Sequence, residues 1–148
     1  MDKWPPPDSS GWRGIRDPAE RLKVALRELY AFYRIAGRGL LVIMRDAPLL
    51  GPGLLPSPSR ADLMRGINRE LLEGWGLRGR RREVLGAAIS HATSLTTWQS
   101  LVDQQGLREG EAVELLTALV LAAGLKHERP TAQHLPHSLG ARSANRRK

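Results

Sequence analysis

His91 is the polar side chain whose position best suits ligand chemistry, because it falls within a series of apolar residues at helical spacing. An imidazole on a buried helix face can hydrogen-bond a ligand and change its charge near neutral pH. The alternative is a core histidine satisfied by a backbone carbonyl, as buried polar groups usually are. The series that predicts this buried face is Val84, Ala88, His91, Leu95, Trp98 and Val102.

Aromatic and methionine side chains elsewhere in the chain are candidates for the walls of an apolar pocket. They offer large, adaptable contact areas with few polar atoms, although filling the core is the alternative role. The complete set of predicted ligand contacts is His91, Trp98, Leu95, Tyr30, Tyr33, Met44 and Trp75.

Metal and catalytic chemistry are not expected. His127, His134 and His137 lie close together, but a metal site needs a fixed cage that the surrounding Pro, Ser, Arg and Asn residues cannot provide. The chain has no cysteine, no Gly-x-Ser-x-Gly, no phosphate loop and no His-Glu-x-x-His. We therefore expect no cofactor, no metal and no enzymatic activity.

The net charge of +8 is concentrated in two places. Residues 126–148 hold six Lys or Arg against one Glu, and the cluster Arg78 to Arg82 adds four arginines. The rest of the chain is close to neutral, so no basic groove is predicted. Weak, non-specific nucleic-acid binding through the tail remains an alternative function.

The elements that position these residues are predicted to be helices, because Leu, Ala, Arg and Glu far outnumber strand-favouring residues. A capped helix begins at Asp17 and ends near Gly37 and Gly39, and a short one follows over 40–45. Further helices are expected over 60–73, 80–104 and 109–123. The resulting single domain is an all-α bundle of about five helices over 17–125, after an extended arm (1–16) and before a disordered basic tail (126–148).

The run Glu111 to Gly124 is apolar on almost every side of its predicted helix. Such a helix must be covered all round, which one core of this size does not easily achieve. The run therefore predicts a homodimer. The longest near-apolar stretch, Leu115 to Leu125, is only about half as long as the roughly 20 residues of a membrane span. The amino end also lacks an apolar signal segment, so a soluble cytoplasmic protein without membrane contact is expected.

Several segments resemble the carboxyl-terminal regulatory domain of tetracycline-repressor-like (TetR-type) transcriptional regulators, over roughly residues 4–123. The resemblance implies that the inner helices bind a small apolar effector and that the last two long helices form a four-helix bundle with a second subunit. It also implies that His91 and Trp98 face the pocket. The segments are Asp17–Leu22, Leu26–Arg34, Val42–Leu49, Leu95–Leu107 and Glu111–Leu115.

The dimer interface implied by this resemblance draws on both helices of the pair. Its predicted residues are Leu101, Val113, Leu115, Leu116, Leu119, Val120 and Ala123.

Such regulators read DNA with an amino-terminal helix-turn-helix head. The sixteen proline-rich residues before Asp17 cannot form three helices, so we expect no specific DNA binding by this chain alone. The expected function is a ligand-sensing and dimerising domain without a DNA-binding head. An alternative is a stand-alone module that dimerises with full-length relatives and withdraws them from DNA.

Overall fold

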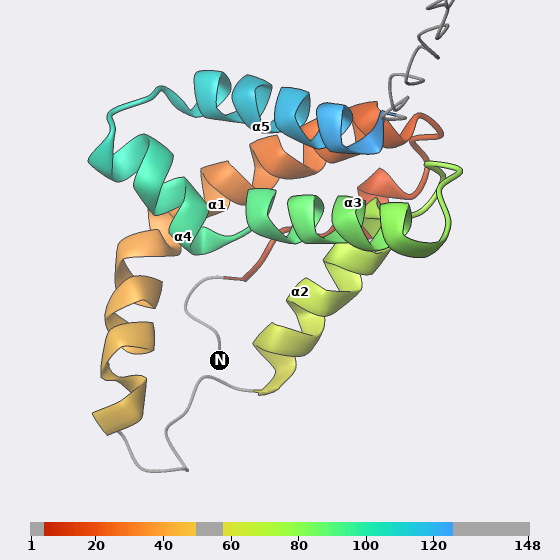
Figure 1. Ribbon diagram of the computed structural model, residues 1–148. Coiled ribbons are helices and arrows are strands. Elements are labelled where there is room, and N and C mark those ends of the chain that lie inside the picture. The colour runs from red at the N-terminus through yellow and green to blue at the C-terminus, as the bar shows by residue number, and fades with distance from the viewer. Residues whose placement is uncertain (1–4, 50–57, 126–148) are drawn as a thin grey trace, which may run out of the picture.

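The computed structural model describes residues 5–49 and 58–125, and within these ranges all regular structure is helical (Figure 1). The all-helical class is thus confirmed, and these ranges contain five α-helices, the number predicted, although the bounds of some differ. Trp4 and the predicted tail lie outside the described residues. The elements are η1 (Ser9–Trp12), α1 (Pro18–Asp46), η2 (Ala47–Leu49), α2 (Pro58–Leu71), α3 (Gly79–Ala92), α4 (Leu95–Trp98), η3 (Gln99–Gln104) and α5 (Glu109–Gly124).

Helix α1 begins as predicted, because the Asp17 side chain accepts a hydrogen bond from the Ala19 N–H at 2.9 Å. Its predicted end at Gly37 and Gly39 is wrong, as is the separate helix over 40–45. The helix continues to Asp46, and Figure 1 shows its second half turning away from the first. Glycine lowers helix propensity by only about 1 kcal/mol, which packing can offset. Here Gly37 is buried beneath the Trp98 ring.

The predicted long helix over 80–104 is also wrong, since it breaks at Thr93 and Ser94 between α3 and α4. The Ser94 hydroxyl accepts from the Thr96 N–H at 3.3 Å and so caps α4. Serine and threonine side chains compete in this way for backbone groups that a continuous helix would use. After α4 the backbone winds as a π-helix over η3.

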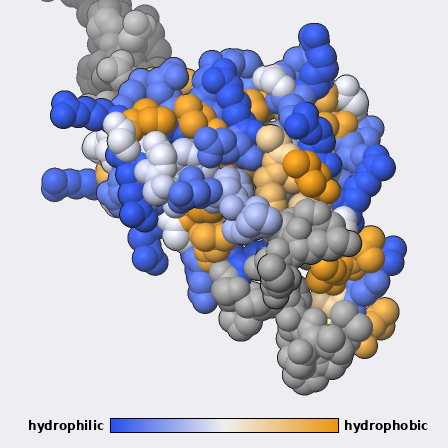
Figure 2. All heavy atoms as spheres, turned by 180° about the vertical axis from the view of Figure 1, so that it is seen from behind, coloured by the Kyte–Doolittle hydropathy of each residue, from blue (hydrophilic) through white to orange (hydrophobic). Residues whose placement is uncertain are grey.

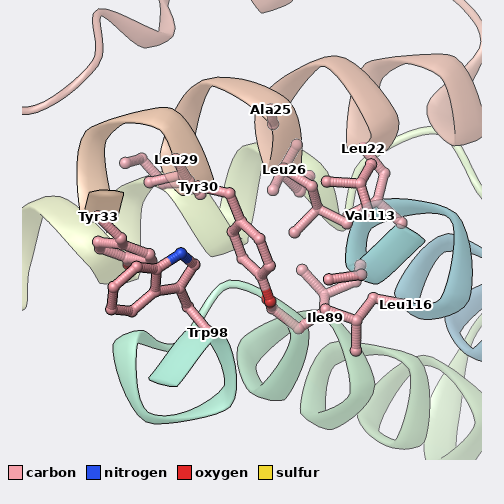
Figure 3. Close-up of a cluster of buried hydrophobic side chains, with 14 of the residues drawn as sticks. Leu22, Ala25, Leu26, Leu29, Tyr30, Tyr33, Ile89, Trp98, Val113 and Leu116 are labelled. Carbon is pink, nitrogen blue, oxygen red and sulfur yellow. The ribbon is translucent and has the colours of Figure 1, made fainter. Parts of the chain in front are cut away.

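Two tyrosines of α1 complete this break. The Tyr30 hydroxyl donates to the Ala92 carbonyl at 3.0 Å, and the Tyr33 hydroxyl donates to the Thr93 carbonyl at 2.7 Å. Figure 3 shows Tyr30 reaching from α1 across the core, with Tyr33 and Trp98 beside it. Both carbonyls belong to the end of α3, so the tyrosines fix the turn from within the core.

Helices α3 and α5 lie side by side and run in opposite directions, with α1 packed against α5 (Figure 1). Helix α5 starts without a Ser or Asp cap. Its first turn is held instead by the Glu111 carboxylate, which accepts a hydrogen bond from the Arg108 N–H at 2.9 Å. Its inward residues are Ala112, Val113, Leu116, Thr117 and Val120.

The amino-terminal arm is held by Trp12. Its side chain is 1% exposed, and its indole N–H donates to the Glu28 carboxylate at 2.6 Å. The inward side of α2 carries Ile67 and Leu71, which are both buried. No helix in the described ranges is long and apolar enough to cross a membrane.

Candidate functional site

A cavity of about 450 Å³ lies between the second half of α1, α2 and the junction of α3 with α4. In Figure 1 the second half of α1 and α2 lie on opposite sides of the lower part of the view, with the α3–α4 junction above them. Its walls are mainly apolar, with Leu40, Ile43 and Met44 from α1 facing Leu63 and Met64 from α2. A cavity of this size and character suits a small apolar molecule.

The cavity opens toward exposed apolar surface. Ile43 and Met44 line it and yet are 39% and 52% exposed. Figure 2, seen from behind, shows hydrophobic side chains gathered at the carboxyl end of α1, at the lower right of that view. Apolar residues that remain accessible at the mouth of a cavity favour entry of an apolar ligand.

A small polar network forms the inner wall. The Thr93 hydroxyl donates to the Asn68 side-chain oxygen at 2.7 Å, and the Tyr33 hydroxyl donates to the Thr93 carbonyl. Burial raises the pKa of Tyr33 to about 12, despite the smaller opposing effect of the Arg60 charge. Tyr33 therefore stays neutral and acts here as a hydrogen-bond donor rather than as an acid or base.

The predicted ligand residues separate into groups. Tyr33, Met44 and Leu95 line the cavity. Tyr30 and Trp98 are buried in the core behind it, which agrees with the alternative core-filling role. Trp75 does not line the cavity. Its ring lies within 3.6 Å of a β-carbon built on Gly124, and its N–H donates to the Leu71 carbonyl.

The prediction that His91 lies on a buried face is wrong. The inward residues of α3 are Leu85, Ile89 and Ala92, so the face is displaced by one position from the predicted series. His91 is exposed, and Val84 is 45% exposed. In the sequence, the residues from Val84 to Val102 looked like one continuous buried stripe. In the structure the helix breaks at Thr93 and Ser94, so that Val84 and His91 are exposed on α3 whereas Leu95 and Trp98 are buried beyond the break.

His91 instead borders a second, smaller hollow of about 190 Å³ between α3, α4, η3 and α5. The Thr97 hydroxyl donates to the His91 carbonyl at 2.6 Å and lies 3.5 Å from each ring nitrogen. The remaining walls include four of the residues predicted for the dimer interface. They are Leu101, Leu115, Leu116 and Leu119.

The predicted interface residues do not share one environment. Val113, Leu116 and Val120 are buried in the core of their own chain, which covers this side of α5. Leu115 and Leu119 are 42% and 55% exposed on its outer side. Leu101 and Ala123 are half-buried. Among the predicted interface residues, the exposed apolar side chains therefore lie on the outer side of α5.

The arginine cluster at the start of α3 is partly engaged in the fold. Arg82 donates to the Leu72 carbonyl at 3.1 Å and pairs with Glu73 at 2.9 Å, and Arg80 pairs with Glu83 at 3.0 Å. These contacts give the cluster a structural role. The three histidines considered for metal binding lie outside the described residues.

The sequence did not single out the polar residues of the cavity or the residue shared by both hollows. The sequence signal that could have indicated Arg60 and Asn68 is their position on the same predicted helix as Leu63 and Met64. All four residues line the cavity. Thr96 lines the cavity and also the hollow beside α5. No family model, curated protein or solved structure matches this chain.

Proposed function

We propose that this chain is the ligand-sensing and dimerisation domain of a TetR-type regulator. The observation that carries this proposal is the position of Thr96, which forms part of the cavity wall and part of the wall of the second hollow. A four-residue helix, α4, thus separates a space suited to a ligand from a surface suited to a second subunit.

The dimer part of the proposal rests on the outer side of α5. Leu115 and Leu119 are one helical turn apart and exposed, and His91 of α3 lies beside them across the hollow. Val84 lies on the same side of α3 as His91, two turns earlier. Two antiparallel helices with such a face form a four-helix bundle when a two-fold axis brings the same face of another copy against them.

In the proposed mechanism, α4 transmits ligand binding in the cavity to the hollow beside α5. A ligand in the cavity contacts Leu95 and Thr96 at the start of α4, and any displacement there changes the hollow between α4 and α5. Binding then shifts the two subunits relative to each other, provided that the ligand favours one arrangement over the other. By linkage, the dimer and the ligand must alter each other's affinity by the same factor.

Light scattering tests the dimer. We expect the unaltered chain to have twice the mass of one chain, and Leu119→Glu to be monomeric with unchanged far-UV circular dichroism. The control is Ile35→Glu, because Ile35 is 68% exposed on α1 and does not line the hollow beside α5. A monomeric unaltered chain at tens of micromolar, or a dimer that survives Leu119→Glu, contradicts the proposed assembly.

A neutral apolar fluorophore, N-phenyl-1-naphthylamine, tests the cavity. We expect a fluorescence increase on binding, which Ala61→Trp abolishes because Ala61 lines the cavity and the larger side chain fills it. Ala87→Trp is the matched control on the exposed side of α3. Equal binding by both variants would show that the fluorophore binds elsewhere.

A further inference from the structure

Resting on the proposed function, we propose that the cavity binds an elongated apolar monocarboxylate whose carboxylate lies beside Arg60. Arg60 is the only charged residue among the described side chains that line the cavity. The other polar groups of the wall are neutral amides and hydroxyls. The wall therefore carries one positive charge and no negative charge, and it favours an anion.

Arg60 also differs in its partners from two other cations, Arg38 and Lys23. Arg38 pairs with Asp103 at 3.2 Å, and Lys23 pairs with Glu114 at 2.7 Å. Within residues 5–49 and 58–125, none of the ion pairs includes Arg60. Its guanidinium carbon instead lies 6.0 Å from the ring centre of Phe32.

This placement suits recognition of a carboxylate. A cation–π contact with the Phe32 ring, itself part of the cavity wall, holds the guanidinium in place. The N–H groups of a guanidinium form a fork that matches the two oxygens of a carboxylate. The surrounding apolar side chains reduce screening by water and so strengthen the attraction.

The length of the cavity indicates an elongated ligand. Arg60 and Asn68 lie eight positions apart on α2, which corresponds to about 12 Å along the helix axis. Leu63 and Met64 line the cavity between them. The Asn68 oxygen already accepts from Thr93, so its NH₂ group is the donor left for a polar atom at the far end. An acyl chain fits the apolar stretch between these two polar ends.

Displacement of N-phenyl-1-naphthylamine by decanoate and by decanol, at neutral pH, tests this assignment. The two probes share one chain length and differ in charge. We expect Arg60→Gln to weaken decanoate binding by about tenfold or more, as loss of a charge-assisted hydrogen bond implies. Decanol and the fluorophore should change by less than about twofold, since neither depends on a charged contact.

Two variants of α2 are the controls. Arg65→Gln removes an exposed charge that pairs with Asp62 and does not line the cavity, so it should leave both probes unaffected. Arg60→Lys keeps the charge and should retain most of the decanoate affinity. It also shows whether the Gln variant acts through charge or through loss of the fold.

The outcomes separate the inference from the proposed function. Equal effects of Arg60→Gln on decanoate and decanol, with the fluorophore still bound, overturn the carboxylate assignment and leave the cavity as an apolar site. Failure of the fluorophore and both probes to bind the unaltered chain overturns the ligand-binding function itself, and this inference with it.

Discussion

A β-carbon placed on Gly37 would lie 2.9 Å from Cζ3 of Trp98 and 3.3 Å from Cδ1 of Leu95. Helix α1 and helix α4 approach this closely only because residue 37 has no side chain. The glycine that looked like a helix end in the sequence is instead the contact point between the two helices, and the remainder of α1 continues beyond it.

Alanine at this position should therefore destabilise the fold. We expect Gly37→Ala to lower the free energy of unfolding by about 1–3 kcal/mol, because overpacking outweighs the gain in helix propensity. The control is Gly66→Ala in α2, where nothing lies within 4 Å and a gain of about 0.5–1 kcal/mol is expected. Urea unfolding of both variants measures the difference, and a stabilised Gly37→Ala would contradict the close contact.

The two buried tryptophans should respond differently to the same change. The Trp98 indole N–H has no hydrogen-bond partner among the described residues, whereas the Trp12 N–H donates to Glu28. Trp12→Phe and Trp98→Phe remove the same atoms, so the difference isolates that bond. We expect Trp12→Phe to cost about 1.5 kcal/mol or more beyond Trp98→Phe in chemical denaturation. Equal losses would argue against the Glu28 contact.

The junction of α3 and α4 depends on the Thr93 hydroxyl. It is buried and donates to Asn68 at 2.7 Å, so Thr93→Val leaves the Asn68 oxygen without this donor. We expect a loss of about 1–2 kcal/mol in thermal or urea unfolding. Thr117→Val is the control, because the Thr117 hydroxyl donates to the Val113 carbonyl within its own helix and contributes little there. Similar losses in both variants would show that the Thr93–Asn68 hydrogen bond contributes no more to stability than the Thr117 bond within α5.

Alkaline pH should unfold this protein through its two tyrosines. Burial raises the pKa of Tyr30 above its ordinary range and that of Tyr33 to about 12. Their contribution to stability is complete below about pH 10, where an unfolded tyrosine begins to ionise, and is lost as the pH rises toward 12. We expect the free energy of unfolding to fall by about 1.4 kcal/mol per pH unit for each tyrosine in this window.

Tyr33→Phe provides the check on this pH dependence. It should roughly halve the slope of stability against pH above 10, although it lowers stability at neutral pH by removing the hydrogen bond to Thr93. The measurement is urea unfolding at a series of pH values, followed by circular dichroism. A slope that does not change in the variant would mean that Tyr33 ionises freely in the folded state.

Local signals in the sequence were sufficient for much of the fold. The cap at Asp17, the inward side of α2 and the bounds of α5 follow from residue types and spacing that act within one or two turns. The break at Thr93 and Ser94 was missed because Tyr30 and Tyr33, about sixty residues away, help to decide it. The same break displaced the predicted face of α3 and moved His91 out of the candidate pocket.

The cavity could be predicted only in part for a similar reason. Tyr33, Met44 and Leu95 were chosen by residue type, and they line it. Arg60 and Asn68 belong to the site because α2 packs across α1 and α3. The spacing of residues along the chain does not show which helices pack together. Residue type alone likewise could not separate the buried Leu116 from the exposed Leu115.

The two tyrosine hydrogen bonds also set an order of events during synthesis. Each closes a loop of about sixty residues, so α1 emerges from the ribosome well before the carbonyls that its tyrosines bind. Until residue 93 has been added, the row of leucines on α1 has no partner from α3 and is open to chaperones or to other nascent chains. The contacts of α1 with α3 are thus tied to translation of the α3–α4 junction, and the core is complete only when α5 has followed.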